Sequence, residues 1–240
     1  FLGLLMKKIL SFICLLSYCG FAITAQDSAD DAIYLDGWQH GDNGGYGFQP
    51  WIIDEAFEDN FTIASSLTNG GFSATNNIDT NSKSFTINNN ANSSDYINAW
   101  RYFENELEPG QIFSFSVDVN WRDGFKGIRI QDNNEQALFR FEVGNRGDGD
   151  GAWVDDVVDE AIKINDIYSD DTQYEITLAQ LSPSGGDWTV RRTGEFEDID
   201  FGKYIGRPSH FQLYSLNANS QIYANTVSYT HLRAHETPMS

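Results

Sequence analysis

The chain has 240 residues, of which 40% are hydrophobic and 21% charged, and its 35 acidic and 15 basic residues give a formal net charge of −20. This charge repels nucleic acid and anionic membrane surfaces, which excludes both as expected partners. The length suffices for one sizeable hydrophobic core. We therefore expect a single acidic domain, whose carboxylates could attract divalent cations.

The first 25 residues have the pattern of an export signal. A short basic region that starts at Met6 is followed by an apolar run, residues 9–22, and Ala25 offers a small residue for cleavage. The run is shorter than the roughly 20 residues that cross a bilayer as a helix, and it contains both cysteines of the chain. We expect a secreted or cell-surface protein without disulfides and without membrane insertion after signal removal.

Hydrophobic residues then alternate with a period of two, which is typical of strands. In residues 112–121 the side chains of Phe113, Phe115, Val117 and Val119 fall on one face and polar side chains on the other. Trp121 continues this apolar face, so we expect it to be buried. The other expected strands are residues 51–57, 61–65, 84–88, 96–104, 127–131, 137–143, 174–181, 187–192, 209–216 and 221–226.

These strands predict an all-β fold. Turns at residues 132–134 and 183–186 indicate two hairpins, and only residues 155–164 could form a helical turn. Many short strands at regular spacing are typical of a two-sheet antiparallel β-sandwich, or jelly roll. Phe139, Phe141 and Phe211 are expected to share its core with the apolar face of residues 113–119.

The expected domain covers residues 26–226. The remaining segment, residues 227–240, contains two of the four histidines and a single acidic residue, unlike the Asn- and Asp-rich chain before it. It resembles translated sequencing-adapter read-through, so we expect it to be a non-native tail.

The opening of the expected domain carries a distinctive motif. Residues 36–51, DGWQHGDNGGYGFQPW, resemble the GW-x-x-GDNGG-x-GF-x-x-W opening of exported bacterial concanavalin-like modules, whose function is mostly unknown. The resemblance spans nearly the whole domain and implies a concanavalin-like jelly roll, but it carries no active site to transfer. Within the motif, we expect Trp38 and Trp51 to lock a tight loop from the core, with ligand stacking as the alternative.

Catalytic motifs are weak or missing. The sequence has no nucleophile elbow, no zinc-protease motif and no cysteine nucleophile in the expected domain. The nearest carboxylate cluster, residues 195–200, lacks the spacing of a glycosidase pair. His40 and His210 are the only histidines before the tail. The sequence therefore favours a function without catalysis.

Aromatic side chains offer a binding chemistry instead. Tyr46 and Trp153 lie in Gly-rich segments, and Trp100 lies beside Arg101, so these four residues are the candidate ligand contacts through ring stacking on sugars. Asp148 and Asp150 are candidate calcium ligands. Their segment departs from an EF-hand at Ala152 and at Trp153, where a glycine is required.

Three functions follow. The first is an exported noncatalytic module that binds extracellular polysaccharide or mediates cell-surface contact. The net charge favours neutral glycans for it. The alternatives are a polysaccharide lyase or glycoside hydrolase domain on the same fold, and a purely structural domain of a larger surface protein. A face lined by rings would favour the first, and converging Tyr, His and Arg side chains or two facing carboxylates would favour the second.

Overall fold

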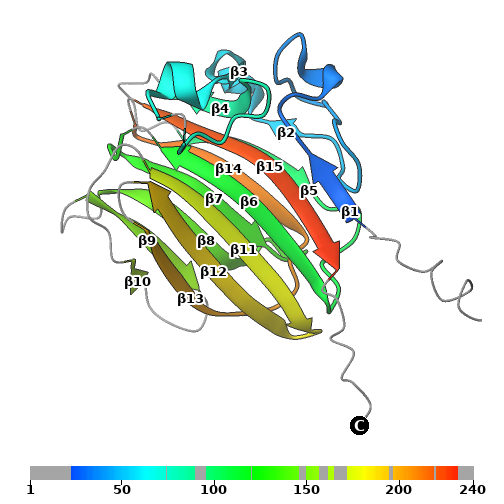
Figure 1. Ribbon diagram of the computed structural model, residues 1–240. Coiled ribbons are helices and arrows are strands. Elements are labelled where there is room, and N and C mark those ends of the chain that lie inside the picture. Colours follow the sequence, from blue (N-terminus) through cyan, green and yellow to red (C-terminus); the bar gives the residue numbers. More distant parts are fainter. Residues whose placement is uncertain are drawn as a thin grey trace, which may run out of the picture.

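Two antiparallel sheets pack face to face in the computed structural model (Figure 1). The structure describes residues 23–73, 75–89, 96–119, 121–145, 150–156, 162–164, 172–194, 197–218 and 220–231. No helix in these ranges is long and apolar enough to span a membrane.

The eight-stranded sheet lies in front in Figure 1. Its order is β13 (Asp198–Ile205), β12 (Gly185–Gly194), β11 (Thr172–Ser182), β6 (Gln111–Val119), β15 (Gln221–His231), β4 (Ser84–Asn88) and β3 (Phe61–Ala64), and β1 (Ile23–Asp27) also pairs with β15.

The seven-stranded sheet lies behind it. Its order is β10 (Ile162–Lys163), β9 (Asp150–Asp156), β8 (Ala137–Asn145), β7 (Phe125–Gln131), β14 (His210–Leu216), β5 (Tyr96–Tyr102) and β2 (Ile52–Ile53). Three short helical segments complete the described elements: η1 (Ala32–Tyr34), η2 (Glu55–Asn60) and η3 (Ser66–Gly70).

The core between the sheets confirms the predicted sandwich. One cluster contains all seven expected side chains, each almost fully buried: Phe113, Phe115, Val117, Val119, Phe139, Phe141 and Phe211. The period of two explains this result, since every second side chain of a strand points to the same face. Both predicted hairpins, β7–β8 and β11–β12, are also present.

Several expectations about local structure are wrong. Trp121 is 57% exposed, because β6 ends at Val119 and its alternation does not extend to residue 121. The expected strand at residues 51–57 is only β2, because Asp54 caps η2 by accepting a hydrogen bond from the Ala56 amide. Of residues 155–164, the structure describes the end of β9, strand β10 and Ile164; residues 157–161 lie outside the described residues, so the helical turn stays a prediction.

The ends of the sandwich also differ from the expected strands. β13 was not expected as a strand, and β15 continues past residue 226 to His231, where it pairs with β6 and β1. Ala25, at the expected cleavage point, is fully buried in β1. The domain boundaries at residues 25 and 226 stay predictions.

The glycine-rich motif surrounds a buried ion pair. The Arg101 guanidinium lies 3.3 Å from the Asp27 carboxylate and donates hydrogen bonds to the backbone carbonyls of Asp42 and Gly44. Asp27 also accepts from the Tyr34 hydroxyl and the Trp51 indole. Burial raises the pKa of Asp27 to about 6, although the positive charge of Arg101 opposes the shift. These contacts tie β1, β5 and the motif loop together.

The motif is therefore an element of the core. Trp38 and Trp51 are both buried and pack edge to face, which confirms that they lock the loop. Gly45 has a φ of +67°, and a Cβ at this position would lie 1.8 Å from the Gln26 carbonyl oxygen. Only glycine fits there, because the loop backbone passes directly against β1.

Candidate functional site on the outer face of the seven-stranded sheet

A row of six side chains crosses the outer face of the seven-stranded sheet. Directly opposite residues of an antiparallel pair point to the same side, so the strand register defines the row. Neighbouring strands are about 4.8 Å apart, so five spacings make the row about 24 Å long. In strand order from β2 to β9, this transverse row consists of Ile52, Trp100, Gln212, Arg129, Arg140 and Asp155.

A shorter row lies beside it and contains Tyr102, His210 and Gln131. The Tyr102 ring stacks on the His210 imidazole, with centroids 4.3 Å apart and planes at 19°. His210 Nδ1 lies 2.8 Å from the Ser209 hydroxyl. Burial lowers the pKa of His210, while the charges of Glu135 and Asp132 oppose the shift, so the imidazole is neutral at pH 7.

Two adjoining hollows follow these rows. The first has a volume of about 340 Å³ and the second about 290 Å³, and both are lined by Arg129, Gln131 and Glu135. Shared lining residues make the hollows neighbouring parts of one groove across the strands. The first hollow is completed by Ile52, Trp100, Tyr102, His210 and Gln212, and the second by Ala137, Arg140, Asp155 and Asp156.

Most charges on this face have a partner within it. Arg140 donates to the Asp155 carboxylate through Nε, at 2.6 Å, and through Nη2. The Tyr214 hydroxyl donates to Glu142 at 2.6 Å. Arg129 differs, because among the described residues its guanidinium donates only to the neutral amide oxygen of Gln212, at 3.2 Å, and lies 5.6 Å from the centre of the Tyr214 ring.

The structure brings two of the four predicted ligand contacts to this face. Trp100 lies in the transverse row and is half-buried. Trp153 lies opposite Glu142 on β9, but it is only 6% exposed, so the expectation of an exposed ring is wrong. Arg101 is fully buried in the ion pair with Asp27 and is closed to a ligand. Tyr46 is 49% exposed but bridges to Gln26, away from this face.

The side chains of the predicted calcium ligands fall outside the part of the chain that the structure describes. Asp148 and the side chain of Asp150 lie outside the described residues. Within the ranges that the structure describes, no group of three or more His, Cys, Asp or Glu side chains could hold a metal ion. Calcium binding at Asp148 and Asp150 stays a prediction.

Sequence reasoning missed Tyr102, Arg129, His210 and Gln212. A signal for them existed, since each alternates with core residues in a strand that was predicted. The sequence pattern did not show that β5, β14 and β7 are neighbours in one sheet, so it could not bring these side chains together. Arg129 and Gln212, for example, are 83 residues apart in the chain.

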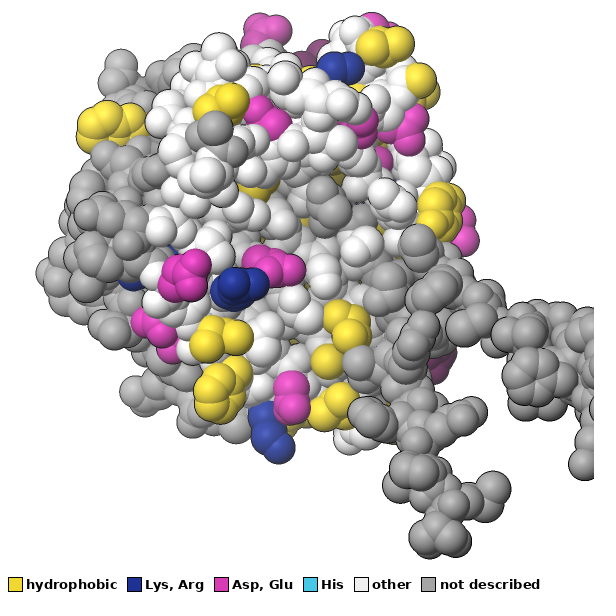
Figure 2. Space-filling view, viewed as in Figure 1, with side chains coloured by type: hydrophobic (Ala, Val, Ile, Leu, Met, Phe, Trp, Pro, Cys, Tyr) yellow, Lys and Arg dark blue, Asp and Glu magenta, His cyan; other side chains and the backbone are white. Residues whose placement is uncertain are grey.

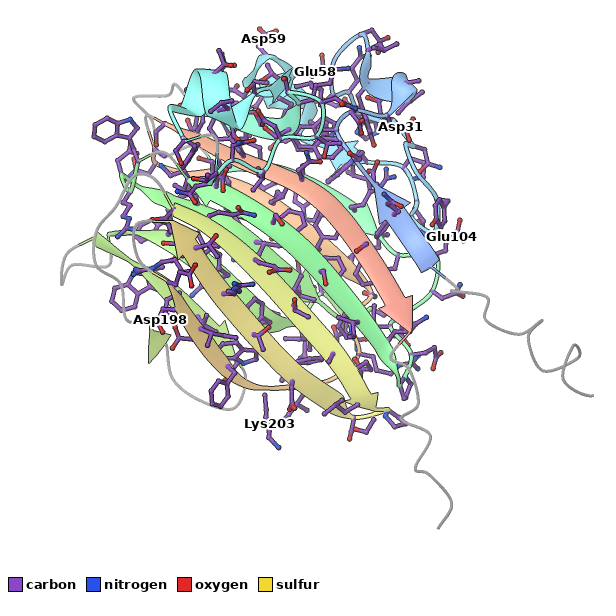
Figure 3. All side chains as sticks on the ribbon, viewed as in Figure 1. Asp31, Glu58, Asp59, Glu104, Asp198 and Lys203 are labelled. Carbon is purple, nitrogen blue, oxygen red and sulfur yellow. The ribbon has the colours of Figure 1, made fainter. Side chains whose placement is uncertain are left out.

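A larger cavity, of about 1060 Å³, lies elsewhere. It is formed by the N-terminal segment, η2 and β3, and Figure 3 shows Glu58 and Asp59 of its lining at the top of the molecule. The rings that border it, Tyr34, Trp38 and Phe61, are buried in the core. This cavity therefore lacks the accessible ring that Trp100 supplies on the sheet face.

Among the described side chains, the outer face of the eight-stranded sheet carries no comparable row. Figure 2 shows this face with charged side chains of both signs scattered over it and hydrophobic ones in small groups. Phe201 and Ile205 of β13 are exposed hydrophobic side chains. Figure 3 shows Asp198 and Lys203 at different positions along the same strand.

Comparisons with known proteins support the fold. No protein family and no curated protein matches the sequence. Among solved structures, the chain is similar to the catalytic domain of a glycoside hydrolase family 131 protein from Coprinopsis cinerea. The TM-score is 0.54 at 10% identity, over 92% of this chain and 97% of that one.

Two further solved structures show weaker similarity. One is the marine PL-14 alginate lyase from Aplysia kurodai, with a TM-score of 0.46 at 9% identity over 88% and 100% of the two chains. The other is the legume lectin-like domain from Entamoeba histolytica, with a TM-score of 0.42 at 11% identity over 73% and 91%. With the strand order above, the glycoside hydrolase similarity identifies the fold as a jelly-roll β-sandwich of the concanavalin-like type.

Proposed function

We propose that this protein binds a carbohydrate chain along the outer face of its seven-stranded sheet. The observation that carries the proposal is the transverse row, which combines the Trp100 ring with the Arg129 guanidinium in one groove. Sugars present apolar ring faces and a belt of hydroxyl groups. A half-buried indole supports stacking on the former, and the half-buried Arg129 guanidinium supplies hydrogen bonds to the latter.

The shape of the site favours an extended ligand. Two adjoining hollows along a row of about 24 Å suit a chain of several sugars better than one small molecule. The similar solved domain from Coprinopsis cinerea is a glycoside hydrolase, so the same fold serves carbohydrate chemistry in that protein. Together with the export signal that the sequence predicts, this supports our proposal of an extracellular polysaccharide as the ligand and a secreted or cell-surface location.

A catalytic function on the same face is the second candidate. One observation favours it: Tyr102, His210 and Arg129 line the same hollow. A neutral imidazole can accept a proton, a phenol can donate one, and a guanidinium can stabilise negative charge, which are the parts that polysaccharide β-elimination needs. His210 is only 2% exposed and is covered by the Tyr102 ring, which favours binding over catalysis.

Calorimetry against a panel of polysaccharides tests the first proposal. We expect micromolar or weaker binding, about −8 kcal/mol or less in magnitude, and a loss of about tenfold in Trp100→Ala. Trp121→Ala removes an exposed ring that lines neither hollow and should leave binding unchanged. If no member of the panel binds, a structural role replaces the proposal.

Assays for unsaturated products and new reducing ends separate binding from catalysis. Turnover that His210→Ala abolishes would establish the enzyme. The same polysaccharides bound without turnover would leave the binding function.

A further inference from the structure

We infer that the groove selects acidic polysaccharides, and that the Arg129 guanidinium binds the carboxylate of a uronate unit. The inference rests on the proposed function, because it specifies the ligand class of the same site. It reverses the expectation of neutral glycans, which came from the net charge of the whole chain.

Within the part of the chain that the structure describes, Arg129 is a cation without an anionic partner on a crowded polar face. Its only polar side-chain contact among the described residues is the Gln212 amide. Arg140, directly opposite it on β8, is by contrast paired with Asp155. Glu142, the other carboxylate at the centre of the face, accepts from Tyr214. Glu135, which lines both hollows, is an exposed carboxylate, but it is not within ion-pair distance of Arg129. Arg129 is therefore the group that an anionic ligand would complete.

The position of Arg129 adds to this argument. It is half-buried and borders both hollows, so a chain lying in the groove would pass over it. Arg129 Nη1 donates a hydrogen bond to the Gln212 side-chain oxygen, and the guanidinium carbon of Arg129 lies over the Tyr214 ring. Such a fixed planar fork matches the two oxygens of a carboxylate, which is why arginine is common where carboxylates are recognised.

The net charge of −20 does not contradict the inference. Long-range repulsion between exposed charges is screened beyond about 8 Å at physiological ionic strength. A contact with a half-buried guanidinium is shorter than this distance and is screened much less. Local pairing therefore dominates at physiological salt, although repulsion would slow the approach of a polyanion at low salt.

Matched pairs of polymers provide the test. Polygalacturonate and alginate are each titrated beside their methyl esters, which keep the sugar chain and remove the charge. We expect each free acid to bind at least about tenfold more tightly than its ester. Arg129→Gln should abolish this preference, because the free acid then loses at least about tenfold more affinity than the ester does.

The control is Arg191→Gln, which removes an exposed arginine of β12, in the opposite sheet, opposite Glu175. It should keep the preference for the free acids. Far-ultraviolet circular dichroism and thermal unfolding confirm that both variants are folded.

Each remaining outcome has a defined meaning. Equal affinity for acid and ester, or an unchanged preference in Arg129→Gln, would overturn the inference while the proposed function stands. Arg129-dependent binding of a sulfated polymer, with no binding of either uronate, would also overturn it. No binding of any neutral or acidic polymer would overturn both.

Discussion

Trp100 and Arg129 lie in register on either side of Gln212, on strands β5 and β7 of the same sheet. Two strand spacings separate them by about 10 Å, so one short oligosaccharide can contact both the indole and the guanidinium. The apolar and the polar contact of the groove are thus held at a fixed distance by the sheet itself.

This spacing predicts how affinity depends on ligand length. A monosaccharide reaches only one of the two side chains, so affinity should rise steeply until the oligosaccharide spans about 10 Å and level off near 24 Å, the length of the transverse row. Calorimetry with oligosaccharides of increasing length measures the curve, and Trp100→Ala should flatten its early rise. Equal affinity for the monosaccharide and the longest oligomer would contradict the extended groove.

Releasing Arg140 should strengthen acidic ligand binding. Asp155→Asn removes the carboxylate that pairs with Arg140 in the transverse row. If acidic polysaccharides bind there, their affinity should rise by up to about fivefold, the size of a partly exposed ion pair worth ~0.2–1 kcal/mol. Asp187→Asn removes the same charge from the exposed surface of β12 in the opposite sheet and serves as the control in the same titration. A weaker affinity in Asp155→Asn would show that Asp155 itself contacts the ligand.

The buried ion pair predicts a pH dependence of stability. Burial raises the pKa of Asp27 to about 6, so the folded state retains this proton more strongly than the unfolded chain, in which the carboxyl titrates near 3.9. The contribution of this group to the free energy of unfolding is therefore highest below about pH 4. It falls as the pH rises to about 6, by on the order of 3 kcal/mol.

Asp27→Asn removes this titration and isolates it from the other carboxyl groups. Urea unfolding of both proteins at pH 4 and pH 7 gives their difference in free energy. The wild type should lose stability relative to Asp27→Asn between the two values. If the wild type instead gained stability relative to Asp27→Asn between pH 4 and pH 7, the charge of Arg101 would outweigh burial and lower the pKa of Asp27.

The motif loop predicts a steep response to one added methyl group. In Gly45→Ala the new Cβ would meet the Gln26 carbonyl oxygen, so we expect a loss of more than about 2 kcal/mol in the free energy of unfolding. Gly41 also has a positive φ, +92°, but has no atom within 4 Å of its added Cβ. Gly41→Ala should therefore cost only about 1 kcal/mol, the strain of the backbone alone. Similar losses in both variants would show that the contact with β1 is unimportant.

How far the sequence predicts this structure depends on the range of the interaction. Strand β6 was predicted because alternation within ten residues decides which side chains enter the core. The same alternation does not show where a strand ends, so the exposure of Trp121 was missed. Arg101 was predicted to contact the ligand because it follows Trp100 in the sequence. Adjacent residues of a strand point to opposite faces of the sheet, so the two side chains cannot both reach the groove. The groove depends on contacts between β5, β14 and β7, and no local pattern encodes their pairing.

Backbone amide chemical shifts during titration with a bound oligosaccharide test most directly whether the outer face of the seven-stranded sheet is the binding site. The account predicts that the largest changes fall on the amides of Trp100, Gln212 and Arg129 and on the Trp100 indole. Changes gathered on β11 to β13, or around the cavity near Glu58 and Asp59, would contradict it.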